Sequence, residues 1–293
     1  MATSYAFLPQ RAVLSLTGPD TIVLLERLVT HGTADWADGE TRFGALLTPQ
    51  GKVISDYLAL RTADGVLLDV AKDSLPDLRK RLTLFRLRAD VAIEPREDLF
   101  VIAGMDAAEH GVRPISGASH VYLDPRYPGG RLRALATEAD WNAWYGYHPA
   151  EWSRPLPDYH ADRIEAGIAE WGADYGAAEV FPADINMDRL NGVDLGKGCF
   201  VGQEVVSRMH RRGNIRKRTL CVEGEGLATG TSLTAEASLG DITSVEGGFG
   251  LARVRIDRLA KAGTDCLKVG GRVVKVHLPE WLKTEMQAIL THG

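Results

Sequence analysis

A short segment near residue 200 concentrates the residue types that could do chemistry. It reads, in order, Lys197, Gly198, Cys199, Phe200, Val201, Gly202, Gln203 and Glu204. A basic stretch follows at residues 208–218, beginning with Arg208 and containing no acid. Positive charge favours the thiolate, the nucleophilic and metal-binding form of cysteine, and glycines allow a loop to approach a ligand closely. We therefore predict that Cys199 is a reactive thiol; the alternative is a buried, inert cysteine.

The composition limits the class of protein. The chain has 293 residues, 45% hydrophobic and 25% charged, which is enough for two or three globular domains. Its net charge is -5, so any site for a polyanion must be local, and residues 208–218 are the strongest candidate. No apolar run approaches the roughly 20 residues of a membrane helix. We expect no membrane partner and a monomer, and the acidic net charge makes a nucleic-acid partner the weakest alternative.

The cysteines indicate a compartment. Cys199, Cys221 and Cys266 are odd in number and widely spaced, which favours neither a disulfide framework nor a zinc site. Because reduced thiols are typical of the cytosol, we predict a cytoplasmic protein.

The elements that must position the cysteine segment follow from hydrophobic periodicity and turn residues. Strands are predicted at residues 12–16, 42–47, 52–61 and 66–71, and helices at residues 20–31, 73–88, about 138–145, 158–171, 182–190 and 204–211. The cysteine lies in the loop at residues 191–203. From residue 216 onward, short strands between glycine-rich turns predict a small β-barrel, so the fold class is α+β with a terminal barrel.

The cysteine segment resembles the K-G-C-[FY]-x-G-Q-E signature of the YgfZ family, folate-binding proteins for assembly and repair of iron–sulfur clusters that include a mitochondrial assembly factor. That family shares its fold with the T protein of the glycine cleavage system, a tetrahydrofolate-dependent aminomethyltransferase. Residues 47–56, 163–167, 172–174, 181–190 and 240–252 resemble further family segments in the same order. The resemblance implies a T-protein-like multidomain fold around a central folate cavity. It also implies three domains: residues 1–45 with 158–212 for folate, 46–157 for a second α+β domain, and 213–293 for the β-barrel.

The resemblance also implies a cofactor, tetrahydrofolate or another reduced folate. Glu165, in the R-x-E-x-G segment, matches a glutamate that accepts two N–H donors of the pterin, a directional contact; the alternative is a surface carboxylate paired with an arginine. The other residues expected at the folate are Asp56, Gly198, Gly202, Gln203, Glu204 and Arg208. Glu204 has an equally weighted structural alternative, complementing a helix dipole. Lys197 is expected beside the thiol, where it would favour the thiolate and hold the folate's glutamate tail.

One family position departs from the T-protein pattern. The catalytic aspartate of the aminomethyltransferases corresponds to Ser55 here, followed by Asp56. A hydroxyl carries no charge near neutral pH and cannot stabilise a developing cation as a carboxylate does. We therefore predict an accessory protein that serves iron–sulfur client proteins or assembly factors through Cys199, rather than a classical turnover enzyme. The alternatives are a folate-dependent aminomethyltransferase or other one-carbon transferase, and a tRNA-binding module that uses residues 208–218.

Overall fold

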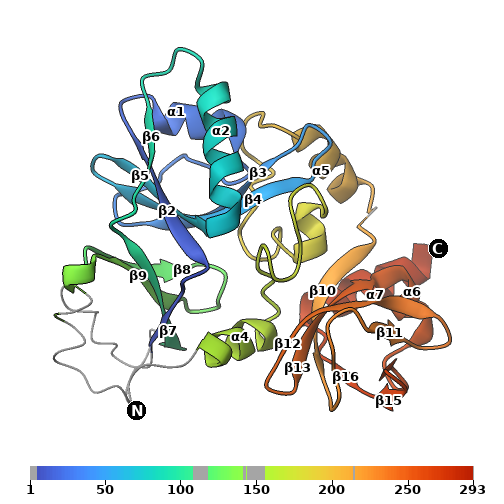
Figure 1. The fold of residues 1–293 in the computed structure, drawn as a ribbon. Helices are drawn as coiled ribbons and strands as arrows, with labels where there is room; N and C mark the ends of the chain where they lie inside the picture. Colours follow the sequence, from blue (N-terminus) through green and yellow to red (C-terminus); the bar gives the residue numbers. More distant parts are fainter. Residues whose placement is uncertain (1–4, 108–117, 141–142, 144–155, 214, 293) are drawn as a thin grey trace. The chain divides into compact units, whose positions relative to one another are not determined.

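The chain divides into two compact units, each assembled from separate segments (Figure 1). The computed structural model describes residues 5–107, 118–140, 143, 156–213 and 215–292. Unit 1 comprises Met1–Tyr159, Gly176–Pro182 and Met187–Ser207, and unit 2 comprises His160–Tyr175, Ala183–Asn186 and Arg208–Gly293. The three domain boundaries implied by the family resemblance stay a prediction.

Unit 1 is built on a five-stranded antiparallel sheet in the order β3-β4-β5-β2-β6. Its strands are β2 (Arg11–Thr17), β3 (Thr41–Leu47), β4 (Val53–Thr62), β5 (Gly65–Ala71) and β6 (Ala92–Pro95). The helices are α1 (Thr21–Leu28) and α2 (Leu75–Arg86), with a 3-10 turn at Lys72–Ser74. The β-ribbon predicted between residues 42 and 71 is confirmed to within one residue at each strand end.

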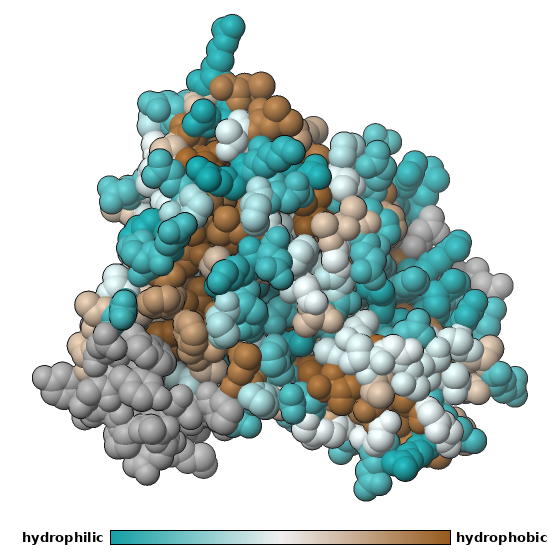
Figure 2. All heavy atoms as spheres, in the orientation of Figure 1, coloured by the Kyte–Doolittle hydropathy of each residue, from teal (hydrophilic) through white to brown (hydrophobic). Residues whose placement is uncertain are grey.

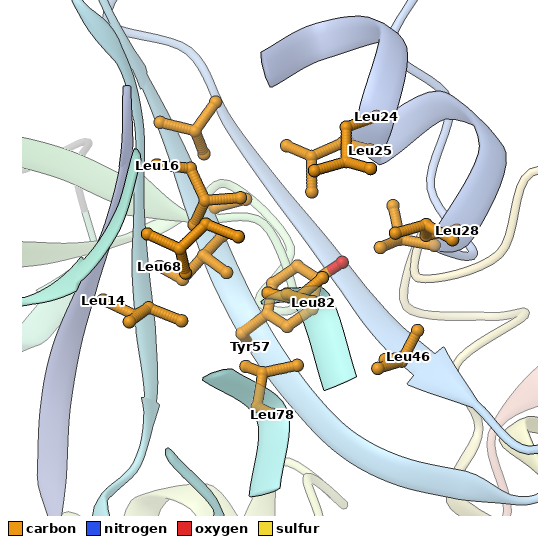
Figure 3. Close-up of a cluster of buried hydrophobic side chains, with 14 of the residues drawn as sticks. Leu14, Leu16, Leu24, Leu25, Leu28, Leu46, Tyr57, Leu68, Leu78 and Leu82 are labelled. Atoms are coloured by element: carbon orange, nitrogen blue, oxygen red, sulfur yellow. The ribbon is translucent and has the colours of Figure 1, made fainter. Parts of the chain in front are cut away.

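The core of this sheet is a leucine cluster around Tyr57 on β4 (Figure 3). Leu24, Leu25 and Leu28 come from α1, and Leu78 and Leu82 from α2. Helical positions three and four residues apart share a face, so both helices place their leucines on the sheet. Each fully buried leucine contributes about 1.5–3 kcal/mol.

A second antiparallel sheet of unit 1 has the order β1-β7-β9-β8. Its strands are β1 (Tyr5–Phe7), β7 (Phe100–Ala107), β8 (His120–Asp124) and β9 (Arg131–Ala136). The helix predicted around residues 138–145 lies largely outside the described residues.

Buried charges join the two sheets of unit 1. Asp69 on β5 accepts hydrogen bonds from Arg11 Nε on β2 and Arg133 Nη1 on β9, both at 2.6 Å. Asp124 on β8 in turn binds Arg133 Nε at 3.1 Å and Arg126 Nη2 at 2.7 Å. Burial alone would raise the pKa of both carboxyls, but the guanidinium groups outweigh it and hold both pKa values below their usual range.

Unit 2 contains a seven-stranded antiparallel sheet in the order β15-β14-β11-β12-β13-β10-β16. Its strands are β10 (Lys217–Glu223), β11 (Ser232–Thr234), β12 (Ser238–Glu246), β13 (Phe249–Arg255), β14 (Lys268–Val269), β15 (Arg272–Val273) and β16 (Lys275–Val276). Two helices that the sequence patterns did not predict, α6 (Ile256–Ala262) and α7 (Glu280–His292), pack against each other and contribute to its core.

Two of the three remaining predicted helices differ from their predicted extent. Helix α4 (Leu156–Glu165) ends six residues before the predicted limit at residue 171, and Gly167 follows it with φ +73°. The helix predicted at residues 182–190 is only a 3-10 turn, Pro182–Ile185, since Asn186 has φ +59° and cannot continue a right-handed helix. Helix α5 (Gln203–Arg211) confirms the helix predicted after the cysteine loop.

An apolar hollow lies on the described surface of unit 1. Figure 2 shows hydrophobic residues gathered over β2, where a cavity of about 500 Å³ is lined by Phe7, Val13, Leu75 and Phe100. None of the helices in the described ranges combines the length and apolarity needed to span a bilayer.

Candidate functional site

Lys197 anchors the cysteine loop to unit 1. Its Nζ donates to the carbonyl oxygens of Val29 at 2.9 Å and His31 at 2.8 Å, and lies 3.5 Å from Glu26 Oε2. The side chain is 2% exposed, and this burial lowers the pKa of Lys197 although Glu26 counteracts the effect. An ammonium has three N–H donors, and these three acceptors match them. Lys197 therefore positions the loop, and its predicted effect on the thiol stays a prediction.

Beneath this anchor lies a buried, neutral histidine. The Nδ1 of His31 is 2.9 Å from the carbonyl oxygen of Gly32, and its ring meets Trp36 edge-on with 5.1 Å between centroids. Burial lowers the pKa of His31 to about 4, and the nearby Lys197 and Arg42 cations act in the same direction. Because the imidazole is neutral, it does not repel the Lys197 ammonium, which donates to the carbonyl oxygen of the same residue, His31.

A second anchor is formed by Asp194 and Thr30. The Asp194 N–H donates to the carbonyl oxygen of Thr30 at 2.8 Å, and Asp194 Oδ1 accepts the N–H groups of Gly196 and Lys197 at 2.8 and 3.1 Å. Thr30 Oγ1 donates to the carbonyl oxygen of Gly192 at 2.6 Å. Sequence reasoning missed these two residues; the D-x-G pattern before the lysine, typical of turns stabilised by aspartate, was the available signal.

The third anchor brings two of the sequence motifs together. Gly202 has φ +80°, and a Cβ there would lie 2.6 Å from the Thr48 carbonyl oxygen and 3.0 Å from Gly51 Cα. Gly51, in the turn between β3 and β4, lies so close that its own Cβ would meet Val205 at 3.1 Å. The ribbon turn and the cysteine loop thus pack backbone to backbone. Only glycine permits both this φ and this approach.

Between these anchors the loop presents Cys199 to solvent. Gly198 and Cys199 are exposed, whereas Phe200 is buried and Val201 packs on the leucine cluster. The Gln203 side-chain amide donates to the Lys197 carbonyl oxygen at 3.4 Å and closes the loop.

Glu204 and Cys266 are exposed, and Cys221 is buried. Exposed Glu204 lies in the first turn of α5, as the helix-dipole alternative requires. Cys266 is also exposed, whereas Cys221 is buried and burial raises its pKa to about 12.

In unit 2, three segments with family resemblance meet at Asp174. Its Oδ2 accepts hydrogen bonds from Arg163 Nη1 at 2.7 Å and the Glu170 N–H at 2.9 Å. Its Oδ1 accepts the hydroxyls of Thr243 and Ser244, both at 2.6 Å. Asp174 therefore ties the end of α4 to strand β12 of the barrel.

Glu165 is the last residue of α4 and is exposed, two residues after the buried Arg163. Arg163, on the same turn of the helix, is bound by Asp174. Burial, and after it the Glu165 carboxylate, raises the pKa of the Cys221 thiol. An exposed carboxylate on a fixed helix end can accept two N–H donors from a ligand.

Ser55 and Asp56 are both inside unit 1. Ser55 Oγ lies 2.9 Å from Ser74 Oγ, in the turn before α2, and its side chain is fully buried. Asp56, the next residue on β4, is 1% exposed. The pKa of the neighbouring Tyr57 is raised chiefly by burial and further by the charge of Asp56. The serine hydroxyl is thus engaged with a neighbouring hydroxyl, and this pair supplies no charge at the position where the aminomethyltransferase pattern requires one.

The predicted folate residues fall in both units. Asp56, Gly198, Gly202, Gln203 and Glu204 belong to unit 1, whereas Glu165 and Arg208 belong to unit 2. Arg208 is exposed on α5. Their joint use of one folate stays a prediction.

The chain is similar to mitochondrial iron–sulfur cluster assembly factor IBA57 homologs. It is 30% identical over 227 residues to that of Mycosarcoma maydis and 31% identical over 246 residues to that of Coccidioides immitis, covering 73% and 74% of this chain. It spans only 55% and 56% of those two proteins. The Homo sapiens IBA57 is 28% identical over 302 residues, covering 94% of this chain and 84% of that protein. Homologues of this chain are iron–sulfur cluster assembly factors.

The fold comparison agrees with the predicted class. The chain resembles the glycine cleavage system aminomethyltransferase T from Bartonella henselae with a TM-score of 0.75 and 15% identity, covering 94% of this chain and 85% of that one. Residues 216–284 match the family model of the CAF17 C-terminal β-barrel domain. The predicted α+β, T-protein-like fold with a C-terminal β-barrel is confirmed. The narrower resemblance to the YgfZ family stays a prediction.

The predicted cytoplasmic location is wrong, because these homologues are named as mitochondrial proteins. Reduced, widely spaced cysteines argue against an oxidising compartment. They do not distinguish the cytosol from another reducing compartment, so the prediction rested on a feature that both share.

Proposed function

We propose that this chain is an accessory factor in iron–sulfur cluster assembly that binds a reduced folate and acts through the thiol of Cys199. The single observation that carries the proposal is the exposed Cys199 on a loop held at Lys197, Asp194 and Gly202. A loop that served only packing would bury its cysteine, as Cys221 is buried in the barrel. The assembly factors to which the chain is similar supply the class of reaction.

The chemistry of the thiol is ligation of iron. A thiolate binds iron in protein clusters, and Cys199 can bind when its S–H proton leaves to water as the Fe–S bond forms. The anchored loop fixes the sulfur relative to unit 1, while its exposure leaves room for a cluster carried by another protein. Cluster iron is here a cargo that passes on to a client.

The folate is assigned to Glu165. The fold is one that the aminomethyltransferases use, and the exposed Glu165 carboxylate on the fixed end of α4 suits the amino and N–H edge of a pterin. The buried Ser55–Ser74 hydroxyl pair provides no carboxylate for aminomethyl transfer. We therefore propose that the folate is bound without that transfer.

The thiol is tested by replacing Cys199 with serine in cells that depend on this protein. Cys199→Ser should leave thermal stability near wild type and abolish the activity of iron–sulfur client enzymes. The matched control is Cys266→Ser, which changes the other exposed cysteine and should leave client activity intact. Full client activity in the Cys199→Ser cells would refute the thiol half of the proposal.

The folate is tested separately by titrating the purified protein with tetrahydrofolate under reducing, anaerobic conditions. Glu165→Gln keeps the shape of the side chain but removes its charge, and should weaken binding by about tenfold or more, since a charge-assisted hydrogen bond is worth about 1.5–3 kcal/mol. Glu225→Gln, at an exposed position in the barrel unit, is the control. No saturable binding at millimolar tetrahydrofolate would remove the folate half.

A further inference from the structure

A hollow of about 260 Å³ opens on unit 2 where strands β10, β12 and β13 meet helix α6. Its lining is dominated by polar atoms and includes four cations: Lys217, Arg253, Arg255 and Arg258. Gly240 and Asp241 of β12 also line it. None of these residues belongs to the cysteine loop or to the Asp174 cluster.

The strand register explains why the cations converge. Lys217 on β10 lies opposite Arg255 on β13, and Arg253, two residues before Arg255, lies opposite Asp241 on β12. Residues two apart on a strand point to the same face of a sheet. The three basic residues therefore project from one side of β10 and β13.

Arg258 completes the hollow from the first turns of α6. Its Nη1 donates to the Ser238 carbonyl oxygen at 2.7 Å, which fixes the guanidinium over the start of β12. Gly240 allows this strand to lie close to its neighbour, because a Cβ there would overlap the carbonyl oxygen of Arg253. The hollow is thus shaped by backbone packing as well as by side chains.

Basic residues outnumber acidic residues in the lining of this hollow. Asp257 forms a bidentate pair with Arg255, at 2.9 and 2.6 Å, and Asp241 Oδ1 accepts the Ser232 hydroxyl at 2.6 Å. The lining therefore brings four basic residues around one carboxylate, Asp241, while Asp257 pairs with Arg255, on a chain whose net charge is -5. Lys217 and Arg258 are exposed, so their donors can reach a ligand.

We propose that this hollow binds a phosphate group. Phosphate carries up to two negative charges and presents several acceptor oxygens, which guanidinium groups bind through paired N–H donors. The source is free phosphate or the phosphate of a nucleotide, and both share this recognition chemistry. The site is independent of the proposed function, because no residue that binds folate or iron in that proposal lines it.

The test is calorimetric titration of the full-length protein with inorganic phosphate and, separately, with adenosine monophosphate, at low chloride concentration. The double variant Lys217→Gln and Arg258→Gln removes two exposed cations of the hollow. The matched control is Lys268→Gln and Arg272→Gln, which removes two exposed cations from β14 and β15. Thermal unfolding of each variant shows whether the fold is retained.

The proposal predicts saturable phosphate binding that the hollow variant weakens by about tenfold or more and the control leaves unchanged. Tighter binding of the nucleotide, lost in the same variant, would support the proposal with a nucleotide as the source. Equal binding of both probes would support it with the phosphate group alone. Failure of wild type to bind either probe at about 10 mM, where a specific ion site should be saturated, would overturn it. Equal weakening in both double variants would do so as well.

Discussion

Replacing Gly202 with alanine tests whether the cysteine loop packs on the ribbon turn as described. Alanine at φ +80° is strained, and its Cβ would lie 2.6 Å from the Thr48 carbonyl oxygen. The matched control is Gly39→Ala, because Gly39 has φ +82° with nothing within 4 Å of the added Cβ. Both positions belong to unit 1. The difference between the two variants isolates the contact from the backbone strain.

The magnitudes follow from these two contributions. A left-handed alanine costs about 1–2 kcal/mol, and the lower entropy of the unfolded chain returns about 0.4–1 kcal/mol. Gly39→Ala should therefore lower the free energy of unfolding by about 1 kcal/mol. Gly202→Ala adds the cost of overpacking against backbone, about 1–3 kcal/mol, for a total of about 2–4 kcal/mol.

The assay is urea unfolding followed by tryptophan fluorescence, with the urea dependence of the free energy held in common. Alkylation of Cys199 in the folded protein gives a second readout, because a displaced loop changes access to the sulfur. Equal destabilisation by the two alanine variants would falsify the backbone-to-backbone packing of the loop on the turn.

The other predictions concern thiols, the buried aspartate of unit 2, and pH. Iodoacetamide should alkylate Cys199 and Cys266 in the folded protein and Cys221 only after unfolding, since burial raises the pKa of Cys221 to about 12. Mass spectrometry of the labelled peptides measures this. Labelling of Cys221 in the folded protein would contradict its burial. Asp174→Ala should lower the free energy of unfolding by about 3–5 kcal/mol, because the buried Arg163 loses one of its two carboxylate partners and the hydroxyls of Thr243 and Ser244 each lose a hydrogen bond. Asp77→Ala, at an exposed pair with Arg81, should cost less than about 1 kcal/mol. Similar losses in the two variants would show that the Asp174 cluster is not structural. The folded-state pKa of His31 is about 4, below its unfolded value of about 6.5, so the unfolded state binds the proton first and stability should fall by up to about 1.4 kcal/mol per pH unit as pH drops between these values. In His31→Gln, unfolding curves across this window should lose that slope, and an unchanged slope would assign it to other groups. Below about pH 4 the lowered pKa values of Asp69 and Asp124 should cause a further loss of stability, which Asp124→Asn should reduce.

Local sequence signals predicted the elements of unit 1 that have regular periodicity. The β-ribbon was found because glycine and proline turns separate three runs of apolar residues, and α2 was found because its leucines repeat at helical spacing. The stop of α4 near Gly167 and the short turn at Pro182–Ile185 were missed. In both places a residue with positive φ ends the helix, and a pattern of apolar residues carries no information on φ.

The candidate site was predictable only in part. The sequence located Cys199 and Gly202, and the structure places Gly202 against the ribbon turn. Nothing local to Lys197 indicates that its ammonium binds the carbonyl oxygens of Val29 and His31, more than 160 residues away. A lysine near a cysteine in sequence suggests that the lysine favours the thiolate. Its role as an anchor of the loop is visible only in the tertiary contacts.

The discontinuity of unit 1 bears on how the protein is made. Residues Met187–Ser207 belong to unit 1, whose two sheets are complete by residue 136. Within this segment, Val201 packs on the leucine cluster, and Lys197 donates to the carbonyl oxygen of Val29, the residue after α1. During synthesis, the strands of unit 1 therefore emerge before the segment that covers this part of their surface. At about 5–20 residues per second, the loop arrives some seconds after the strands that it covers, and part of the leucine cluster is exposed during that interval. The segment that carries Cys199 is thus the last part of unit 1 to be synthesised.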